Sequence, residues 1–264
     1  MRFFSPMSVN PHPGGFAQRR ISDVPSVTAP QMREIQRVAQ EDFGVDILQI
    51  IENAGRAAAR LTLGMLGGKG RGQRIVILAG GGNKGAAGLC MARTLVNWGF
   101  VVEPVLAEVQ GEMSYVARRQ VQILKAAGIV DKDNEEPSEF LVEEQLANAE
   151  LVVDALIGYG LEGPPMGMAA AVTDLALQSR RPVLALDVPT GVNATTGVAA
   201  GMAIRAVTTL MIDLPKRGLL ELHAKEYTGE LFLADLGIPK AVHEGLGIRH
   251  NLLFSEGPIL RIKR

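Results

Sequence analysis

The stretch RIVILAGGGNKGAAGLCMARTLVNWGF, from Arg74 to Phe100, combines three signals that decide the fold. Its first part, RIVIL, is an apolar run with the length of a buried strand. The middle, AGGGNKGAAGL, is rich in glycine, which permits a sharp turn of the backbone. The last part, CMARTLVNWG, has apolar residues at helical spacing. We therefore expect a strand that passes through a glycine turn into a helix, a unit typical of α/β proteins.

The rest of the chain continues this alternation. Helices are predicted at residues 30–43, 47–66, 84–99, 114–128, 141–147 and 168–178. Strands are predicted at residues 74–80, 100–108, 150–158, 181–187, 206–214 and 229–237. Several strand segments are continuously apolar, which is typical of parallel strands that are buried on both faces. The pattern predicts a doubly wound α/β sandwich with a mostly parallel sheet.

The composition limits the classes of partner. The chain has 264 residues, of which 47% are apolar, and a formal net charge of -1. No basic block favours nucleic acid, and no apolar run reaches the roughly 18 residues of a membrane span. We expect a small-molecule partner instead. The single cysteine, Cys90, excludes an internal disulfide and fits a reducing compartment, so we expect a cytoplasmic protein.

The beginning of the chain differs from the remainder. Residues 1–28 contain Pro, Gly, Ser and Arg but no apolar core of a secretory signal, so we expect a poorly ordered lead. An organellar transit peptide stays open as an alternative. Residues 29–264 are expected to form a single domain, because no linker or internal repeat divides them. The polar segment KDNEEPSEF is interpreted as a solvated loop.

Three interpretations of the glycine turn are open from the residues alone. Gly80, Gly82 and Gly85 match GxGxxG, and Glu103 lies near the distance of a ribose-binding acid, which would indicate a nicotinamide dehydrogenase. The glycines could instead only relieve strain in a tight turn. The third interpretation is an anion or nucleotide site, because free N–H groups at a helix N-terminus favour phosphate.

Two aspartates end apolar strands elsewhere in the chain. Asp154 lies in VVDALIGYGLEGPP and Asp187 in ALDVPTGVN. A carboxylate in such a position costs desolvation unless a partner compensates it, and ligands of open α/β sheets bind at the carboxyl ends of strands. Both aspartates are therefore candidate site residues. The alternative is that each only caps the following helix or turn.

Six segments resemble, in order and spacing, the signature segments of the YjeF N-terminal domain family. They are IIENAGRAAA, AGGGNKGAAGLCMARTLVNWGF, LVVDALIGYGLEGPP, PVLALDVPTGVNATTG, AVTTLMIDLPKRGLL and GELFLADLGIP. The resemblance implies a Rossmann-like three-layer α/β/α sandwich and a homodimer. The best-known members are NAD(P)H-hydrate epimerases, which implies interconversion of the R and S forms of NADHX or NADPHX. A separate dehydratase that repairs the S form is the implied functional partner.

The resemblance also assigns residues to the site. The family's glycine loop, GNNGGDG, reads GNKGAAG here, so Lys84 replaces an asparagine that holds potassium and Ala87 replaces an aspartate. Asp154 matches a potassium ligand and the acid nearest the chemistry, and Thr190 replaces a serine that faces the ion. Lys216 fits a PK step near the site. The implied substrate-binding residues are Asn53, Gly82, Asn83, Gly85, Ala86, Ala87, Gly158, Tyr159, Gly160, Leu161, Glu162, Gly163 and Asp187.

The lysine in the glycine loop changes what the resemblance implies about cofactors. The Lys84 ammonium has three donors, and it could reach the potassium position and bond to Asp154, Thr190 and nearby carbonyl oxygens. We therefore expect that no cofactor is required and that activity is indifferent to potassium. The alternative is a Lys84 side chain that points to solvent, as most lysines do.

The alanine in the same loop bears on activity. Without a carboxylate at Ala87, Asp154 is the main candidate acid or base, and Lys84 and Lys216 are further candidate acids. The alternative function is a noncatalytic nucleotide-binding or dimerisation module that kept the pocket and lost the reaction. The four histidines lack the spacing of a metal site, and Cys90 is expected to be a core residue.

Overall fold

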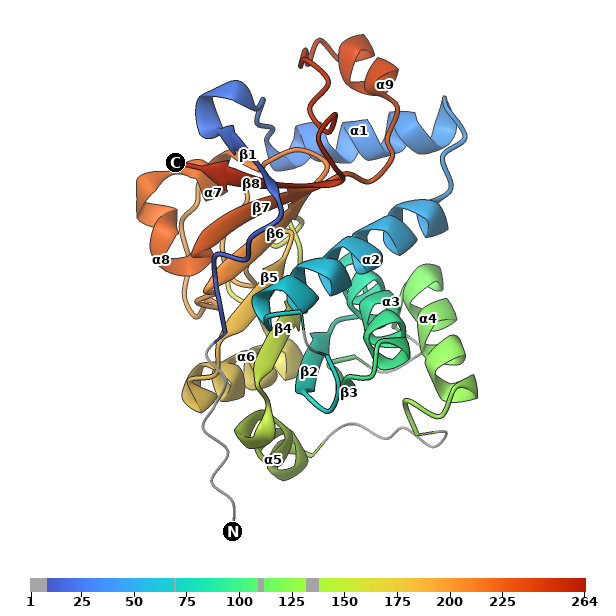
Figure 1. Ribbon diagram of the computed structural model, residues 1–264, viewed down its shortest axis with the longest axis vertical. Helices are drawn as coiled ribbons and strands as arrows, with labels where there is room; N and C mark the ends of the chain where they lie inside the picture. Colours follow the sequence, from blue (N-terminus) through green and yellow to red (C-terminus); the bar gives the residue numbers. More distant parts are fainter. Residues whose placement is uncertain (1–8, 69, 109–111, 132–137) are drawn as a thin grey trace.

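A computed structural model describes residues 9–68, 70–108, 112–131 and 138–264 (Figure 1). Its strands form one sheet of eight, in the order β1-β8-β7-β6-β5-β4-β2-β3. All neighbouring strands are parallel except the antiparallel pair β7 and β8. The strands are β1 (Ala17–Arg20), β2 (Arg74–Ala79), β3 (Val101–Leu106), β4 (Leu151–Ala155), β5 (Val183–Leu186), β6 (Thr208–Ile212), β7 (Glu230–Ala234) and β8 (Ile259–Lys263). The predicted fold class, a mostly parallel α/β sandwich, is confirmed.

Helices cover both faces of the sheet. They are α1 (Ala29–Glu41), α2 (Ile47–Met65), α3 (Asn83–Asn97), α4 (Tyr115–Ala126), α5 (Glu139–Asn148), α6 (Gly167–Ser179), α7 (Arg217–Leu220), α8 (Lys225–Thr228) and α9 (Lys240–Gly245). In Figure 1, α2, α3 and α4 lie together on one side, and α5 and α6 lie on the other. No described helix is long and apolar enough to cross a bilayer.

The alternation of side chains along β2 builds a core on each face of the sheet. Ile75 and Ile77 belong to the core under α2 and α3, whereas Val76 and Leu78 belong to the core under α5 and α6. Successive side chains of a strand point to opposite faces, so a continuously apolar strand serves both cores. This explains why the strand runs are apolar without interruption.

The glycines of the turn allow close packing of α3 on the sheet. A Cβ atom at Gly85 would overlap the carbonyl oxygen of Gly80, and one at Gly88 would overlap the side chain of Ala155 in β4. A Cβ atom at Gly80 would likewise overlap the carbonyl oxygen of Leu156, so the steric interpretation accounts for three of these glycines. It does not account for Gly82, because a Cβ atom there would meet no other atom within 4 Å.

The N-terminal region differs from the expectation of a poorly ordered lead over residues 1–28. Residues 17–20 form β1, which pairs in parallel with β8 at the edge of the sheet, as Figure 1 shows. Phe16 packs edge-on against Phe232, with ring centroids 5.6 Å apart. Residues 9–28 are therefore part of the folded unit. Residues 1–8, and residues 132–137 of the expected polar loop, lie outside the described part of the chain.

Candidate active site

A cavity of about 630 Å³ lies at the carboxyl ends of the central strands. The chain leaves β2 toward β3 on one side and returns to β4 on the other, so the cavity lies at the topological switch point where open α/β sheets bind ligands. Its lining residues are Arg33, Gln36, Ile47, Ile50, Ile51, Ala54, Gly80, Gly81, Gly82, Asn83, Lys84, Ala87, Ala107, Glu108, Leu156, Ile157, Gly158, Tyr159, Gly160, Leu161, Glu162, Pro164, Met166, Ala169, Leu186, Asp187, Leu210 and Ile212.

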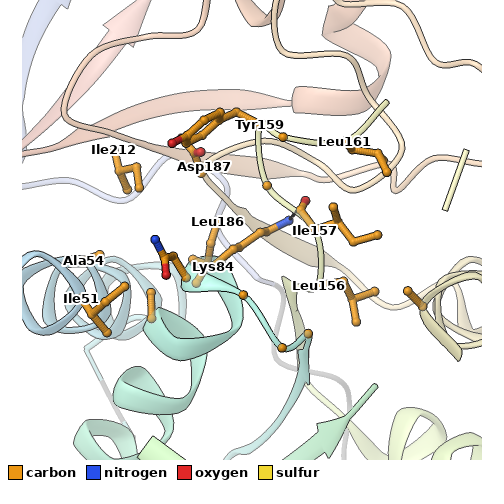
Figure 2. Close-up of a pocket in the computed structure, with 18 of the residues that line it drawn as sticks. Ile51, Ala54, Lys84, Leu156, Ile157, Tyr159, Leu161, Leu186, Asp187 and Ile212 are labelled. Carbon is orange, nitrogen blue, oxygen red and sulfur yellow. Dashed lines mark hydrogen bonds between the residues drawn. The ribbon is translucent and has the colours of Figure 1, made fainter. Parts of the chain in front are cut away.

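The cavity has two halves. Apolar side chains of α2, together with Asp187 and Ile212, line the half that we call the α2 half. Ala107, Leu156 and Met166 belong to the side of the sheet covered by α6, and they line the α6 half. Figure 2 shows Lys84 between Ala54 on one side and Leu156 and Ile157 on the other. The start of α3 therefore lies between the α2 half and the α6 half of one pocket.

Lys84 points inward and not to solvent. Its Nζ donates to Asp154 Oδ1 at 2.9 Å, Val188 O at 2.8 Å, Ile157 O at 3.1 Å and Thr190 Oγ1 at 3.1 Å. The side chain is 5% exposed. Burial lowers the pKa of the Lys84 ammonium, and the carboxylate of Asp154 counteracts that shift. An ammonium has three N–H donors, and one of the four acceptors around Nζ is the carboxylate of Asp154.

Both carboxylate oxygens of Asp154 are occupied by the protein itself. Oδ2 accepts from the Thr190 backbone N–H at 2.7 Å, and Oδ1 accepts from the Thr190 hydroxyl at 2.7 Å and from Leu156 N–H at 3.1 Å. Asp154 is fully buried and is not among the lining residues. It therefore connects the loops after β4 and β5 from behind the pocket.

Asp187, in contrast, lies on the pocket wall. Its backbone has a φ of +61°, a left-handed conformation that is uncommon for a residue other than glycine. Lys216, which is fully buried, places Nζ 2.5 Å from Asp187 Oδ1 as an ion pair without the angles of a hydrogen bond, and donates to Ile212 O at 2.8 Å. One carboxylate oxygen is thus held by a buried cation, and Oδ2 lies beside Gly158 at the pocket.

Tyr159 covers this ion pair. Lys216 Nζ lies 5.7 Å from the centroid of the Tyr159 ring, and the phenol donates to Gln36 Oε1 at 2.6 Å. Burial raises the pKa of Tyr159 to about 12, with a smaller contribution from the charge of Asp187. The phenol is therefore protonated at neutral pH, and it connects α1 to the loop after β4.

The structure places most, not all, of the predicted substrate-binding residues on the cavity. The lining residues include Gly82, Asn83, Ala87, Gly158, Tyr159, Gly160, Leu161, Glu162 and Asp187, but not Asn53, Gly85, Ala86 or Gly163. Asn53 donates to Leu236 O at 2.8 Å and so binds the segment after β7. Gly85 and Ala86 face the interior of the fold.

The dehydrogenase interpretation loses its ribose-binding acid. Glu103 lies in the middle of β3, pairs with Arg74 at 3.6 Å, and does not line the cavity. Glu108, which follows the end of β3, does line it. The sequence reasoning selected Glu103 from its distance to the glycine turn, although the predicted strand 100–108 ends at Glu108.

Other lining residues were also missed. Ile47, Ile50, Ile51 and Ala54 face the cavity, but their spacing in the sequence is the same as that of ordinary core positions on a helix. Arg33 of α1 also lines the cavity, and the sequence reasoning did not predict this cation. In the described residues, no group of three or more His, Cys, Asp or Glu side chains could hold a metal ion.

Comparisons with known proteins show the family of this chain. The profile of the family described as YjeF-related protein N-terminus matches residues 47–218. An NAD(P)H-hydrate epimerase of Dehalogenimonas lykanthroporepellens is 41% identical over 224 residues, which is 85% of this chain and 86% of that protein. An NAD(P)H-hydrate epimerase of Rhodopirellula baltica is 34% identical over 219 residues, 83% of this chain and 87% of that one.

Longer proteins and a solved structure are similar as well. A bifunctional NAD(P)H-hydrate repair enzyme, Nnr, of Moorella thermoacetica is 32% identical over 219 residues, and the match covers 81% of this chain but 41% of that protein. The crystal structure of the yeast protein ynu0 (YNL200c) superposes with a TM-score of 0.73 at 22% identity, covering 90% of this chain and 100% of the yeast chain. The fold, the profile match and the similar relatives together establish that the chain belongs to the YjeF-related protein N-terminus family.

Proposed function

We propose that this protein is an NAD(P)H-hydrate epimerase, which interconverts the R and S forms at C6 of the hydrated nicotinamide ring. The observation that carries the proposal is Asp187, an acid on the wall of a mostly apolar cavity at the switch point of the sheet. Relatives of similar length that are 41% and 34% identical are named NAD(P)H-hydrate epimerase.

The reaction needs a base that can return its proton. The Lys216 ammonium lies 2.5 Å from Oδ1 and forms an ion pair with the carboxylate of Asp187. The carboxylate takes the proton of the C6 hydroxyl, the C6–N1 bond breaks, and an aldehyde forms while N1 receives the proton. Rotation about the C5–C6 bond presents the other face of the aldehyde. N1 then attacks that face and the proton returns to the oxygen, so atoms and charge balance.

The start of α3 is the proposed phosphate site. This helix has 15 residues, and its N-cap, Gly82, has no side chain that caps the first N–H groups. Free N–H groups and the helix dipole favour an anion. Gly82 and Asn83 line the cavity between its halves, so a pyrophosphate there would leave the ring in one half and the adenosine in the other.

Lys84 is proposed to replace a bound monovalent cation. The oxygens of Asp154, Thr190, Ile157 and Val188 converge within 3.1 Å of Nζ, so potassium does not fit beside the ammonium. The side chain thus holds the loops after β4 and β5 in place without an ion. The expected consequence is an activity that is equal in potassium and sodium salts.

The test is conversion of purified R-NADHX, with chromatographic separation of the two epimers. We expect conversion above the spontaneous rate, and at least about a 100-fold lower kcat for Asp187→Asn. Asp42→Asn, a matched change at an exposed position, serves as the control. Conversion by Asp187→Asn at the wild-type rate would refute the role of this residue, and a requirement for potassium would refute that of Lys84.

Ala87 favours a second candidate, a noncatalytic nucleotide-binding module. This alanine lines the cavity at the position where the family resemblance implies an aspartate, so the pocket would lack one carboxylate. Binding of NADHX without conversion would support this candidate. In that case Ala87→Asp combined with Lys84→Asn should restore conversion if the rest of the pocket is intact.

We also propose that the protein is a homodimer and that a separate dehydratase uses its S product. Several similar relatives are named bifunctional NAD(P)H-hydrate repair enzymes, and this chain covers about 41% of one of them. Analytical ultracentrifugation tests the dimer. Addition of an S-specific dehydratase to R-NADHX tests the coupling, since repair faster than spontaneous epimerisation then requires the epimerase.

A further inference from the structure

Glu108 is an acid at the cavity that the proposed reaction does not use. β3 ends at Leu106, and Glu108 lies two residues beyond, among the residues that line the pocket. Its carboxylate lies against the glycine turn, because a side chain at Gly81 would overlap Oε2. Among the described residues it has no hydrogen-bond or ion-pair partner. An exposed, unpaired carboxylate beside a phosphate-type turn is available to a ligand.

Glu108 follows β3, the strand that pairs with β2 beside the glycine turn. β2 leads into the glycine turn and α3, and β3 is the next strand, paired in parallel with β2. In dinucleotide sites of α/β sheets, an acid at the end of this second strand accepts hydrogen bonds from the adenosine ribose. The same acid repels a 2′-phosphate, which other proteins accommodate with an arginine.

The charged residues that line the cavity favour a ribose with two free hydroxyls over a ribose that carries a 2′-phosphate. The cations among the lining residues are Arg33, from α1, and Lys84. Lys84 is already bonded to four oxygen atoms, and Arg33 is near Tyr159, whose pKa it influences, in the α2 half. Of the two cations in the described lining, one is therefore already bonded and the other lies near Tyr159.

We propose that Glu108 binds the two hydroxyls of the adenosine ribose and makes NADHX the preferred substrate over NADPHX. This inference rests on the proposed function, in which the hydrated ring lies in the α2 half near Asp187 and the pyrophosphate lies at the start of α3. The adenosine then occupies the α6 half, between Glu108 and the apolar side chains of Pro164 and Met166.

The test compares kcat/KM for NADHX and NADPHX in the same assay. We expect the wild type to prefer NADHX by about tenfold, since two like-charged groups in contact repel even in water. Glu108→Gln should bring the ratio close to one, mainly by raising KM for NADHX and lowering it for NADPHX. Glu108→Arg should invert the preference.

The matched control is Glu103→Gln, the same change five positions earlier on β3 and outside the cavity. Its ratio should equal that of the wild type. Equal use of both substrates by the wild type, or an unchanged ratio in Glu108→Gln, would overturn the proposal. Thermal unfolding of each variant verifies that the exposed substitution leaves the fold intact.

A separate measurement distinguishes this inference from the proposed function. Calorimetry with ADP-ribose and with 2′-phospho-ADP-ribose measures discrimination without any turnover. A preference for ADP-ribose that is lost in Glu108→Gln supports the inference even if no epimerisation is detected. Normal epimerisation without such a preference overturns the inference and leaves the epimerase proposal standing.

Discussion

Replacement of Lys84 by methionine should destabilise the protein strongly. Methionine keeps an unbranched apolar side chain of similar length but removes the ammonium that compensates Asp154, which is fully buried. Removing one partner of a buried ion pair costs about 3–5 kcal/mol, because the other charge stays buried and unpaired. The carbonyl oxygens of Val188 and Ile157 lose a donor in addition. We expect a loss of about 4 kcal/mol in the free energy of unfolding.

The assay is urea denaturation followed by circular dichroism at pH 7. Lys240→Met is the matched control, since Lys240 forms an exposed ion pair with Glu244, and exposed pairs of this kind contribute about 0.5 kcal/mol or less. Adding Asp154→Asn to Lys84→Met should recover part of the loss, because the remaining side chain is then neutral. A loss below about 1 kcal/mol for Lys84→Met would refute the reasoning.

The variant Lys84→Asn extends the same test to the cation. An asparagine opens the position that Nζ now fills, so potassium should bind and stabilise the variant. The gain is about 2.7 kcal/mol when potassium is present at 100 times its dissociation constant. Sodium or choline chloride at equal ionic strength provides the comparison. A wild-type protein stabilised specifically by potassium would contradict a built-in cation.

Three further predictions concern packing and reactivity. Gly88→Ala should cost about 1–3 kcal/mol in urea denaturation, because the new methyl overlaps Ala155 and forces α3 away from β4. Burial raises the pKa of Cys90 to about 12, so only roughly one thiol in ten thousand is ionised at pH 8, and a thiol reagent should modify it only after unfolding. Phe16→Ala should lower the stability by about 2 kcal/mol by removing the contact with Phe232, whereas no change would show that this contact adds nothing to the fold.

The central strands and their helices could be predicted because their signals are local. A strand such as β2 is apolar throughout, and the helix after it has apolar residues at helical spacing. The strands β1 and β8, which lie at one end of the sheet, were not predicted. Their sequences, AQRR and ILRIK, are short and partly polar, and their pairing joins the two ends of the described chain. A local sequence pattern does not predict a contact between segments so far apart in the chain.

The candidate site was predicted as a set of segments but not as a geometry. Asp154 and Asp187 look alike in the sequence, since each stands at the end of an apolar strand. The structure separates them: Asp154 faces Lys84 behind the pocket, and Asp187, with its left-handed backbone, lies on the pocket wall against Lys216. The two acids have different partners because these lysines approach from different elements of the fold.

The sequence alone determined the α/β class, the glycine turn and the family, because each depends on residue types at fixed spacing along the chain. Tertiary structure alone decided which acid meets the cavity, that Glu108 and not Glu103 lies at its edge, and that Lys84 turns inward. These outcomes depend on where strands end and on which distant side chains converge there. These side chains come together only in the folded sheet, where the pairing of the central strands brings the strand ends side by side.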